Sequence, residues 1–140
     1  MKHTPLALTL INPRKDPMKT ISITFFACAA ALFFTLAHAD PAAKMAGGVL
    51  VDTAGKTLYT FDKDMAGSGK SVCNGPCATL WPPAMAAADA KPEGELTVVT
   101  RDDGAKQWAY QGKPVYTYTG DKKAGDISGD NFKDIWHVIK

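Results

Sequence analysis

Two cysteines, Cys73 and Cys77, are the residues with the clearest chemistry in this chain of 140 residues. They lie four positions apart, in the segment Cys-Asn-Gly-Pro-Cys. In an exported protein such a pair usually forms a disulfide, and closing so short a loop adds about 2 kcal/mol of stability. The spacing differs from the Cys-x-x-Cys of thiol oxidoreductases, and no βαβ pattern accompanies it. We expect a structural disulfide, with thiol redox exchange as an alternative.

Metal binding is the other alternative for these cysteines. Two thiolates and His137, the only histidine after residue 39, leave a zinc site one ligand short. Cu(I) favours sulfur, and three methionines at positions 45, 65 and 85 carry thioethers, although no spacing groups them with the cysteines. The leading interpretation therefore includes no metal and no other cofactor, and Cys73, Cys77 and His137 stay as secondary metal candidates.

A tyrosine, a second aromatic residue and an aspartate recur at the same spacing 57 residues apart. The two sets are Tyr59, Phe61, Asp64 and Tyr116, Tyr118, Asp121. Side chains two apart in a strand share a face, so each pair of aromatic residues points the same way. In one interpretation the aromatic residues pack in the core and the aspartates cap turns. In the other, the hydroxyls and carboxylates bind a polar ligand that stacks on Trp81, Trp108 or Trp136.

Other catalytic and binding patterns are missing from the sequence. It contains neither Gly-x-Ser-x-Gly nor His-Glu-x-x-His, and it has no glycine-rich phosphate loop. The stretch 126–131 alternates oxygen-bearing side chains as a calcium loop does, but Asn131 replaces its glycine and His137 replaces its glutamate. We predict a glycine and aspartate turn there, and no catalytic residue in the chain.

Short alternating runs punctuated by glycine predict an all-β domain of six strands. Two hairpins are expected, one joining 49–51 to 57–61 and one joining 107–110 to 115–118. The run 96–100 is expected to pair with the strand at Trp108, and 135–139 forms a last strand. Residues 78–90 contain Pro82-Pro83 and hold at most one or two helical turns. Because a hairpin is marginally stable alone, the two copies predict a small antiparallel sandwich or barrel-like domain with pseudo-twofold symmetry.

The N-terminal residues have the features of a signal peptide. Met18-Lys19 precedes an apolar run from Ile21 to Leu36, and Ala37-His38-Ala39 fits a cleavage site. We expect cleavage near Ala39, which leaves a periplasmic or secreted protein without a membrane span. Residues 1–17 are interpreted as an upstream extension, with Met1 or Met18 as the start, and Cys28 lacks the context of a lipid-accepting cysteine. The remaining chain divides into a linker at 40–46 and one two-repeat domain at 47–140.

The expected mature protein has too little positive charge for several classes of partner. Residues 40–140 contain 12 basic and 13 acidic residues. Nucleic-acid binding requires a cationic face, and recruitment to anionic membranes requires a basic cluster. We therefore expect no nucleic-acid partner.

These motifs together resemble a family of predicted bacterial lipoproteins and secreted repeat proteins defined by a Tyr-x-(Phe/Trp/Tyr)-x-x-Asp motif. The resemblance covers residues 47–139 and includes 73–83, 103–104, 107–110 and 125–126. The family is described as of unknown function, so the resemblance implies an exported location rather than an activity. The sequence thus predicts a noncatalytic binding or envelope-structural module with an unknown envelope ligand. The alternative is a periplasmic copper, zinc or thiol-redox protein.

Overall fold

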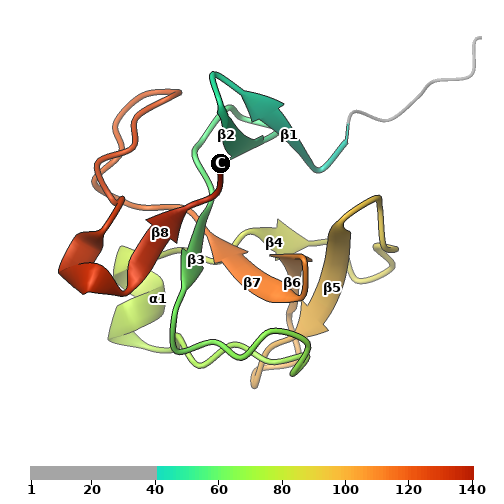
Figure 1. Cartoon of the computed structure of the whole chain (residues 1–140). Helices are drawn as coiled ribbons and strands as arrows, with labels where there is room; N and C mark the ends of the chain where they lie inside the picture. The colour runs from blue at the N-terminus through green and yellow to red at the C-terminus, as the bar shows by residue number, and fades with distance from the viewer. Residues whose placement is uncertain (1–40) are drawn as a thin grey trace, which may run out of the picture. The chain divides into compact units, whose positions relative to one another are not determined.

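The computed structural model describes residues 41–140, and the predicted signal peptide and upstream extension lie outside this range. The elements in chain order are β1 (Ala43–Ala46), β2 (Val49–Asp52), β3 (Tyr59–Phe61), α1 (Pro76–Leu80), β4 (Met85–Ala86), β5 (Leu96–Thr100), β6 (Lys106–Tyr110), β7 (Lys113–Tyr116), the 3-10 turn η1 (Phe132–Asp134) and β8 (Trp136–Val138). The fold is all-β with antiparallel pairing, as expected from the alternating sequence pattern. Figure 1 shows β3 between β7 and β8 in the middle of the molecule.

The strands form two antiparallel sheets. Strands β1 and β2 make a two-stranded sheet. The larger sheet has the order β4-β6-β7-β3-β8, and β5 also pairs with β6. Buried apolar residues make two clusters, one around the aromatic residues of β3, β7 and β8 and one around Leu50, Leu58, Val115 and Ile139. The short β3–β7 pairing therefore has a core cluster on each side of it.

Two sequence expectations about the strands are wrong. The structure has eight strands where six were predicted. The segment 40–46, expected to be a linker, contains β1, whose Lys44 pairs with Val51. The reason is the Gly47-Gly48 turn, in which both residues have positive φ (59° and 84°) and fold β1 back on β2. The two glycines therefore form the turn of a hairpin and do not mark the end of a linker.

Both predicted hairpin turns are present, but the first joins strands of different sheets: Val51 and Thr57 form a single bridge, and β3 pairs with β7 and β8. In the first, the N–H groups of Asp52 and Leu58 donate to the carbonyl oxygens of Lys56 and Leu50. The second turns at Gln111-Gly112, so its second strand begins at Lys113, earlier than expected. A Cβ on Gly112 would lie 2.9 Å from the Gly67 nitrogen, whose N–H donates to the Gly112 carbonyl oxygen. This position therefore requires glycine for both its φ of 82° and its close backbone contact.

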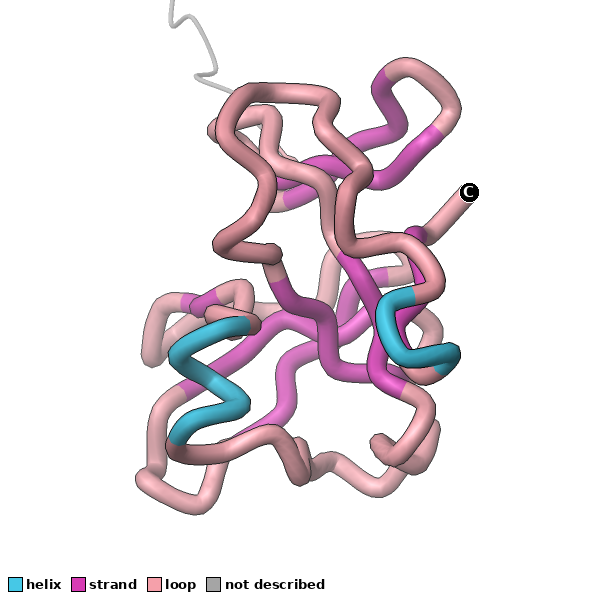
Figure 2. Tube along the Cα trace, turned by 90° about the vertical axis from the view of Figure 1, so that its left-hand side faces the viewer, coloured by secondary structure: helices cyan, strands magenta, loops and turns pink. Residues whose placement is uncertain are grey.

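The two repeats are related by a pseudo-twofold axis between β3 and β7. Tyr59 and Tyr116, which are equivalent in the two sequence copies, are also direct partners across this antiparallel pair. A twofold axis must therefore pass between them. Backbone bonds on either side match in the same way: Asp62 donates to the Ile135 carbonyl, and Thr119 donates to the Leu80 carbonyl. The five-residue helix α1 and the turn η1 occupy corresponding places, and Figure 2 shows the two helical segments on opposite sides of the strands.

The outer strands next to this axis are protected from further pairing. On β8, the outward N–H of Val138 donates to a carboxylate oxygen of Asp130 at 3.0 Å. In the other repeat, Pro82 and Pro83 occupy the position equivalent to β8, and proline has no N–H to offer. The Pro82-Pro83 segment, which was predicted to interrupt a helix, thus lies at an edge of the sheet. The helix before it is only five residues long.

Candidate functional site

The repeated tyrosine and aspartate residues form two reciprocal hydrogen bonds between the repeats. The Tyr59 hydroxyl donates to Asp121 at 2.7 Å, and the Tyr116 hydroxyl donates to Asp64 at 2.5 Å. Both tyrosines are 0% exposed, and the aspartates are 2% and 8% exposed. Each aspartate also accepts a backbone N–H, Asp64 from Val72 and Asp121 from Ser128. We call these two contacts the Tyr–Asp locks.

The locks agree in part with the interpretation in which the aromatic residues pack in the core and the aspartates cap turns. The aspartates accept N–H groups from the loops that follow them, as capping residues do. The second carboxylate oxygen of each aspartate accepts a tyrosine hydroxyl from the other repeat, which turn capping alone does not predict. Among the described residues, no buried side-chain nitrogen or oxygen lacks a hydrogen-bond partner. The hydroxyls and carboxylates of the locks are therefore already occupied within the protein.

Burial changes the acid–base properties of the locks. Desolvation, reinforced by the neighbouring carboxylate, raises the pKa of Tyr59 and of Tyr116 well above the ordinary value of tyrosine. Desolvation also raises the pKa of Asp64, although its hydrogen bonds from Tyr116 and Val72 act in the opposite direction. The phenols thus remain protonated donors throughout the neutral range.

This tyrosine chemistry predicts a loss of stability in alkali. Above about pH 10 the unfolded chain releases the tyrosine protons, whereas the folded protein retains them. The folded state then binds more protons than the unfolded state, so the free energy of unfolding must fall as pH rises past 10. Urea unfolding at pH 8 to 11 measures this fall. The Tyr59→Phe/Tyr116→Phe double variant should show a shallower pH dependence, and an unchanged dependence would contradict the assignment.

A buried arginine extends one lock but not the other. Arg101 is 7% exposed and donates to Ser71, to Gln107 and to the Cys73 carbonyl oxygen at 2.6–3.0 Å. It also donates to the Asn74 side chain at 2.9 Å. The Ser71 hydroxyl lies 2.6 Å from the Tyr116 hydroxyl, so Arg101 is linked to the lock through Ser71.

Sequence reasoning missed three residues of this network, Ser71, Arg101 and Gln107, and it also missed Ser128, which donates to Asp121 in the other lock. Two of them had a usable signal. Ser71 and Ser128 each follow the lock aspartate by seven residues, so the 57-residue repeat extends to them. Arg101 is the only arginine after residue 39, but nothing in its neighbourhood marks it as buried.

The repeat aromatics form a closed stack across the pseudo-twofold axis. Trp81 and Trp136 lie face to face with centroids 3.8 Å apart. Phe61 stacks on Trp136 and Tyr118 stacks on Trp81, each at 4.3 Å. Trp81 and Trp136 are 2% and 3% exposed, so they are packed against protein rather than open to a ligand. Trp108 lies apart from this stack and packs beside Leu58 and Val115 in the other cluster.

The structure joins Cys73 to Cys77 in a disulfide, with the sulfur atoms 2.02 Å apart. Cys73 is fully buried against the aromatic cluster, and the Cys77 carbonyl accepts the Trp81 N–H at 2.8 Å. The disulfide therefore fixes the loop that carries both Ser71 and Trp81. Within residues 41–140, no three histidine, cysteine, aspartate or glutamate side chains are grouped for metal binding.

Removing the disulfide should weaken the fold without abolishing it. The Cys73→Ser/Cys77→Ser variant is expected to lose about 2 kcal/mol of unfolding free energy, because the unfolded chain gains freedom. Chemical denaturation measures the loss, and dithiothreitol should reproduce it in the wild type but not in the variant. Thiol titration of the denatured, unreduced protein should find no free thiols among residues 40–140. Two titratable thiols there would show that the bond does not form.

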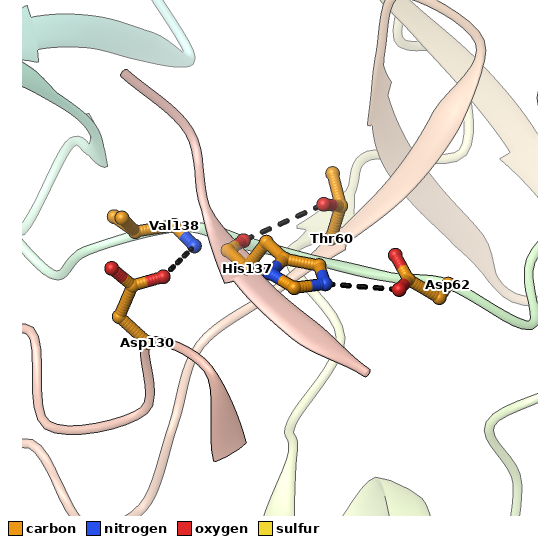
Figure 3. Close-up of polar contacts among 5 residues, drawn as sticks. All are labelled: Thr60, Asp62, Asp130, His137 and Val138. Carbon is orange, nitrogen blue, oxygen red and sulfur yellow. Dashed lines mark hydrogen bonds and ion pairs between the residues drawn. The ribbon is translucent and has the colours of Figure 1, made fainter. Parts of the chain in front are cut away.

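The only histidine of residues 41–140 lies on the face of the sheet opposite the locks. His137 Nε2 lies 2.9 Å from an Asp62 carboxylate oxygen, and the two side chains are 38% and 44% exposed. The Thr60 hydroxyl donates to the His137 backbone carbonyl oxygen at 3.4 Å rather than to the imidazole (Figure 3). The three residues therefore do not form a nucleophile, base and carboxylate relay.

Next to this pair, a groove of about 320 Å³ crosses the same face. We call it the sheet-face groove; it is lined by Thr60, Ala66, Tyr110, Gln111, Lys113, Val138, Ile139 and Lys140. The rim is polar: the Tyr110 hydroxyl and the Gln111 amide both donate to the Glu95 carboxylate, at 2.7 and 2.8 Å. These bonds lower the pKa of Glu95, so this carboxylate stays ionised.

The calcium-like segment is a turn, as the sequence analysis predicted. One Asp126 carboxylate oxygen accepts the backbone N–H groups of Lys122 and Lys123 at 2.8 and 3.0 Å, which lowers its pKa. Asp130 is bonded to Val138 and lies 3.6 Å from the Lys140 ammonium. These carboxylates thus organise the loop from within.

Comparison with known proteins agrees with the internal symmetry. The model of the Lipoprotein_15 family, described as a secreted repeat of unknown function, matches residues 42–85 and again residues 97–140. The two matches end at Met85 and Lys140, in agreement with the equivalence of Trp81 and Trp136. Neither a curated protein nor a solved structure matches the chain. In the range 41–140, no helix has the length and apolar character needed to cross a membrane.

Proposed function

Because this chain belongs to the family of secreted repeats of unknown function, we propose that it is an exported, noncatalytic module that binds a component of the bacterial cell envelope. Export follows from the predicted signal peptide, with Asp40 as the mature N-terminus in the periplasm or outside the cell. Intact-mass analysis tests this processing. A mass that includes Cys28 and a lipid would instead indicate a membrane-anchored protein.

The burial of the repeated tyrosine and aspartate residues is the observation that carries this proposal. The Tyr–Asp locks and the aromatic stack are occupied by contacts within the protein, so their chemistry serves the fold. The sheet-face groove, on the other side of the central strands, offers a surface to a partner. A rigid scaffold with a solvent-facing groove is suited to binding.

The arrangement of polar groups on that face supports binding over catalysis. His137 is paired with Asp62, but the Thr60 hydroxyl is directed at a backbone carbonyl oxygen. The cysteines are held in a disulfide, so neither thiolate is free to act as a nucleophile or a metal ligand. A thiol-redox or metal-binding function of the cysteines would require reduction of this disulfide first.

Sedimentation of the processed protein with isolated envelope fractions tests the proposal. Peptidoglycan sacculi and outer-membrane vesicles are incubated with increasing protein, and the pelleted amount is measured. We expect saturable association of labelled protein with at least one fraction. An excess of unlabelled protein should displace the labelled protein from that fraction. Linear, undisplaced uptake in both fractions would contradict a specific binding role. A disulfide-reduced sample serves as a control for thiol-dependent capture.

A further inference from the structure

The sheet-face groove contains a lysine whose charge has no ion-pair partner. Lys113 is half-buried, and no carboxylate among residues 41–140 lies within ion-pair distance of its ammonium group. Its equivalent in the first repeat, Lys56, is exposed and keeps its hydration. An ammonium group without a carboxylate within ion-pair distance gains Coulomb energy when an anion approaches it. Lys113 is therefore the centre of positive charge in the groove.

Two neighbours complete a set of donors around Lys113. The Thr60 hydroxyl makes only a long bond of 3.4 Å within the protein, so it is free to turn toward a ligand. Lys140 also lines the groove, and its ammonium is 3.6 Å from Asp130 with a side chain that is 69% exposed. Such an exposed pair is weak and yields readily to a better partner. Two ammonium groups and a hydroxyl are the donors that bind an oxyanion.

Several carboxylates lie near the groove. Glu95 is held on the rim, and both of its oxygens already accept hydrogen bonds, from Tyr110 and Gln111. Asp62 is bonded to His137. Asp130 lies 3.6 Å from the Lys140 ammonium, and Lys113 acts electrostatically on the buried Asp64. These carboxylates lie outside the lining of the groove, whose charged side chains are Lys113 and Lys140.

The first repeat shows that the fold does not require these donors. The equivalent region there is a smaller pocket of about 160 Å³, lined in part by Thr53, Ala84 and Met85. Thr53 corresponds to Tyr110 by the 57-residue spacing, and Ala84 and Met85 correspond to Ile139 and Lys140 by the spacing of Trp81 and Trp136. A methionine therefore replaces a lysine at one end, and the second cation is absent. Both lysines of the groove therefore come from the second repeat, and the first repeat contributes Thr60 and Ala66 to its lining.

We propose that the sheet-face groove is an anion-binding site for a phosphate group, carried by a lipid headgroup or by a free phosphate, with Lys113 as its main ligand. This inference rests on the proposed binding function and names the chemistry of its ligand. The volume of about 320 Å³ matches the lower end of small-molecule sites. The Thr60 hydroxyl and the Lys140 ammonium group donate to the phosphate oxygens that Lys113 does not contact.

Titration of the amide NMR spectrum of the processed protein tests the site. Inorganic phosphate is added at constant ionic strength, with sodium chloride as the reference. We expect saturable shifts of the Thr60, Lys113 and Ile139 amides. Lys113→Gln should weaken phosphate binding by about tenfold or more, whereas the matched Lys56→Gln should leave it unchanged. Sedimentation with vesicles of phosphatidylglycerol or of phosphatidylcholine then separates a lipid headgroup from free phosphate.

The outcomes separate this inference from the proposed function. Equal phosphate shifts in both glutamine variants, or shifts that chloride reproduces, would overturn the anion site even if the protein still sediments with an envelope fraction. Selective phosphate binding without envelope association would support the site and contradict the envelope role. Because each lysine change lies outside the core, circular dichroism should show that both variants remain folded.

Discussion

Replacing Tyr116 with alanine is expected to lower the free energy of unfolding by about 3–5 kcal/mol. The change removes a fully buried ring that lies 5.1 Å from Trp136, centroid to centroid. It also leaves the buried Asp64 carboxylate without its hydroxyl donor. Tyr59→Ala should have a similar effect through Asp121, because the two sites are related by the pseudo-twofold axis. Urea unfolding followed by tryptophan fluorescence measures both changes.

The matched controls lie next to these tyrosines in the same strands. Thr60→Ala and Thr117→Ala alter the opposite, half-buried face and should each cost well under about 1 kcal/mol. Tyr116→Phe keeps the ring and removes only the hydroxyl, so it should cost about 1–3 kcal/mol for the unsatisfied carboxylate. If the tyrosine variants unfold at the wild-type midpoint, the Tyr–Asp locks do not hold the repeats together.

Replacing Arg101 with alanine should also cost about 3–5 kcal/mol, because it breaks a buried network of charged hydrogen bonds. The loss leaves Ser71, Gln107 and the Cys73 carbonyl oxygen without this donor. It also removes positive charge near Asp64, and Arg101 is one of the groups that lower the pKa of that carboxyl. Thermal and urea unfolding at neutral pH measure the change.

Two further substitutions test which property of Arg101 matters. Arg101→Lys keeps the charge but loses the planar fork that reaches several acceptors at once, so we expect partial recovery of stability. The exposed Lys133→Ala should stay within about 0.5 kcal/mol of the wild type. Full stability of Arg101→Ala would show that water replaces the guanidinium without cost and would contradict the structural role.

The strand pattern was predictable because the alternation of apolar residues is local. The second hairpin, the pairing of 96–100 with the strand at Trp108 and the strand at 135–139 all follow from runs of a few residues. Strand β1 was missed because Ala43–Ala46 contains no β-branched or aromatic residue, and its pairing depends on a glycine turn. Small residues give weak periodicity whether they lie in a strand or in a linker.

The interactions between repeats were less accessible to sequence reasoning. The 57-residue spacing identified Tyr59 and Tyr116 as equivalent, but not that each donates to the other repeat's aspartate. That exchange depends on the register of β3 against β7, which is set by contacts far apart in the chain. Lys113 was missed for a similar reason, since the groove that it lines with Thr60 and Lys140 is formed by residues far apart in the chain.

The exchange of tyrosine donors between the repeats also bears on how such a domain could have arisen. A single repeat of this kind contains a tyrosine without its aspartate and an aspartate without its tyrosine. Two identical copies would satisfy each other by the same pair of contacts, because a twofold interface is self-complementary. A symmetric homodimer of one-repeat chains is therefore a sufficient ancestor, and gene duplication with fusion would have made the dimer permanent. The two copies now differ, because the first contains a disulfide and the second contributes a pair of lysines to the sheet-face groove.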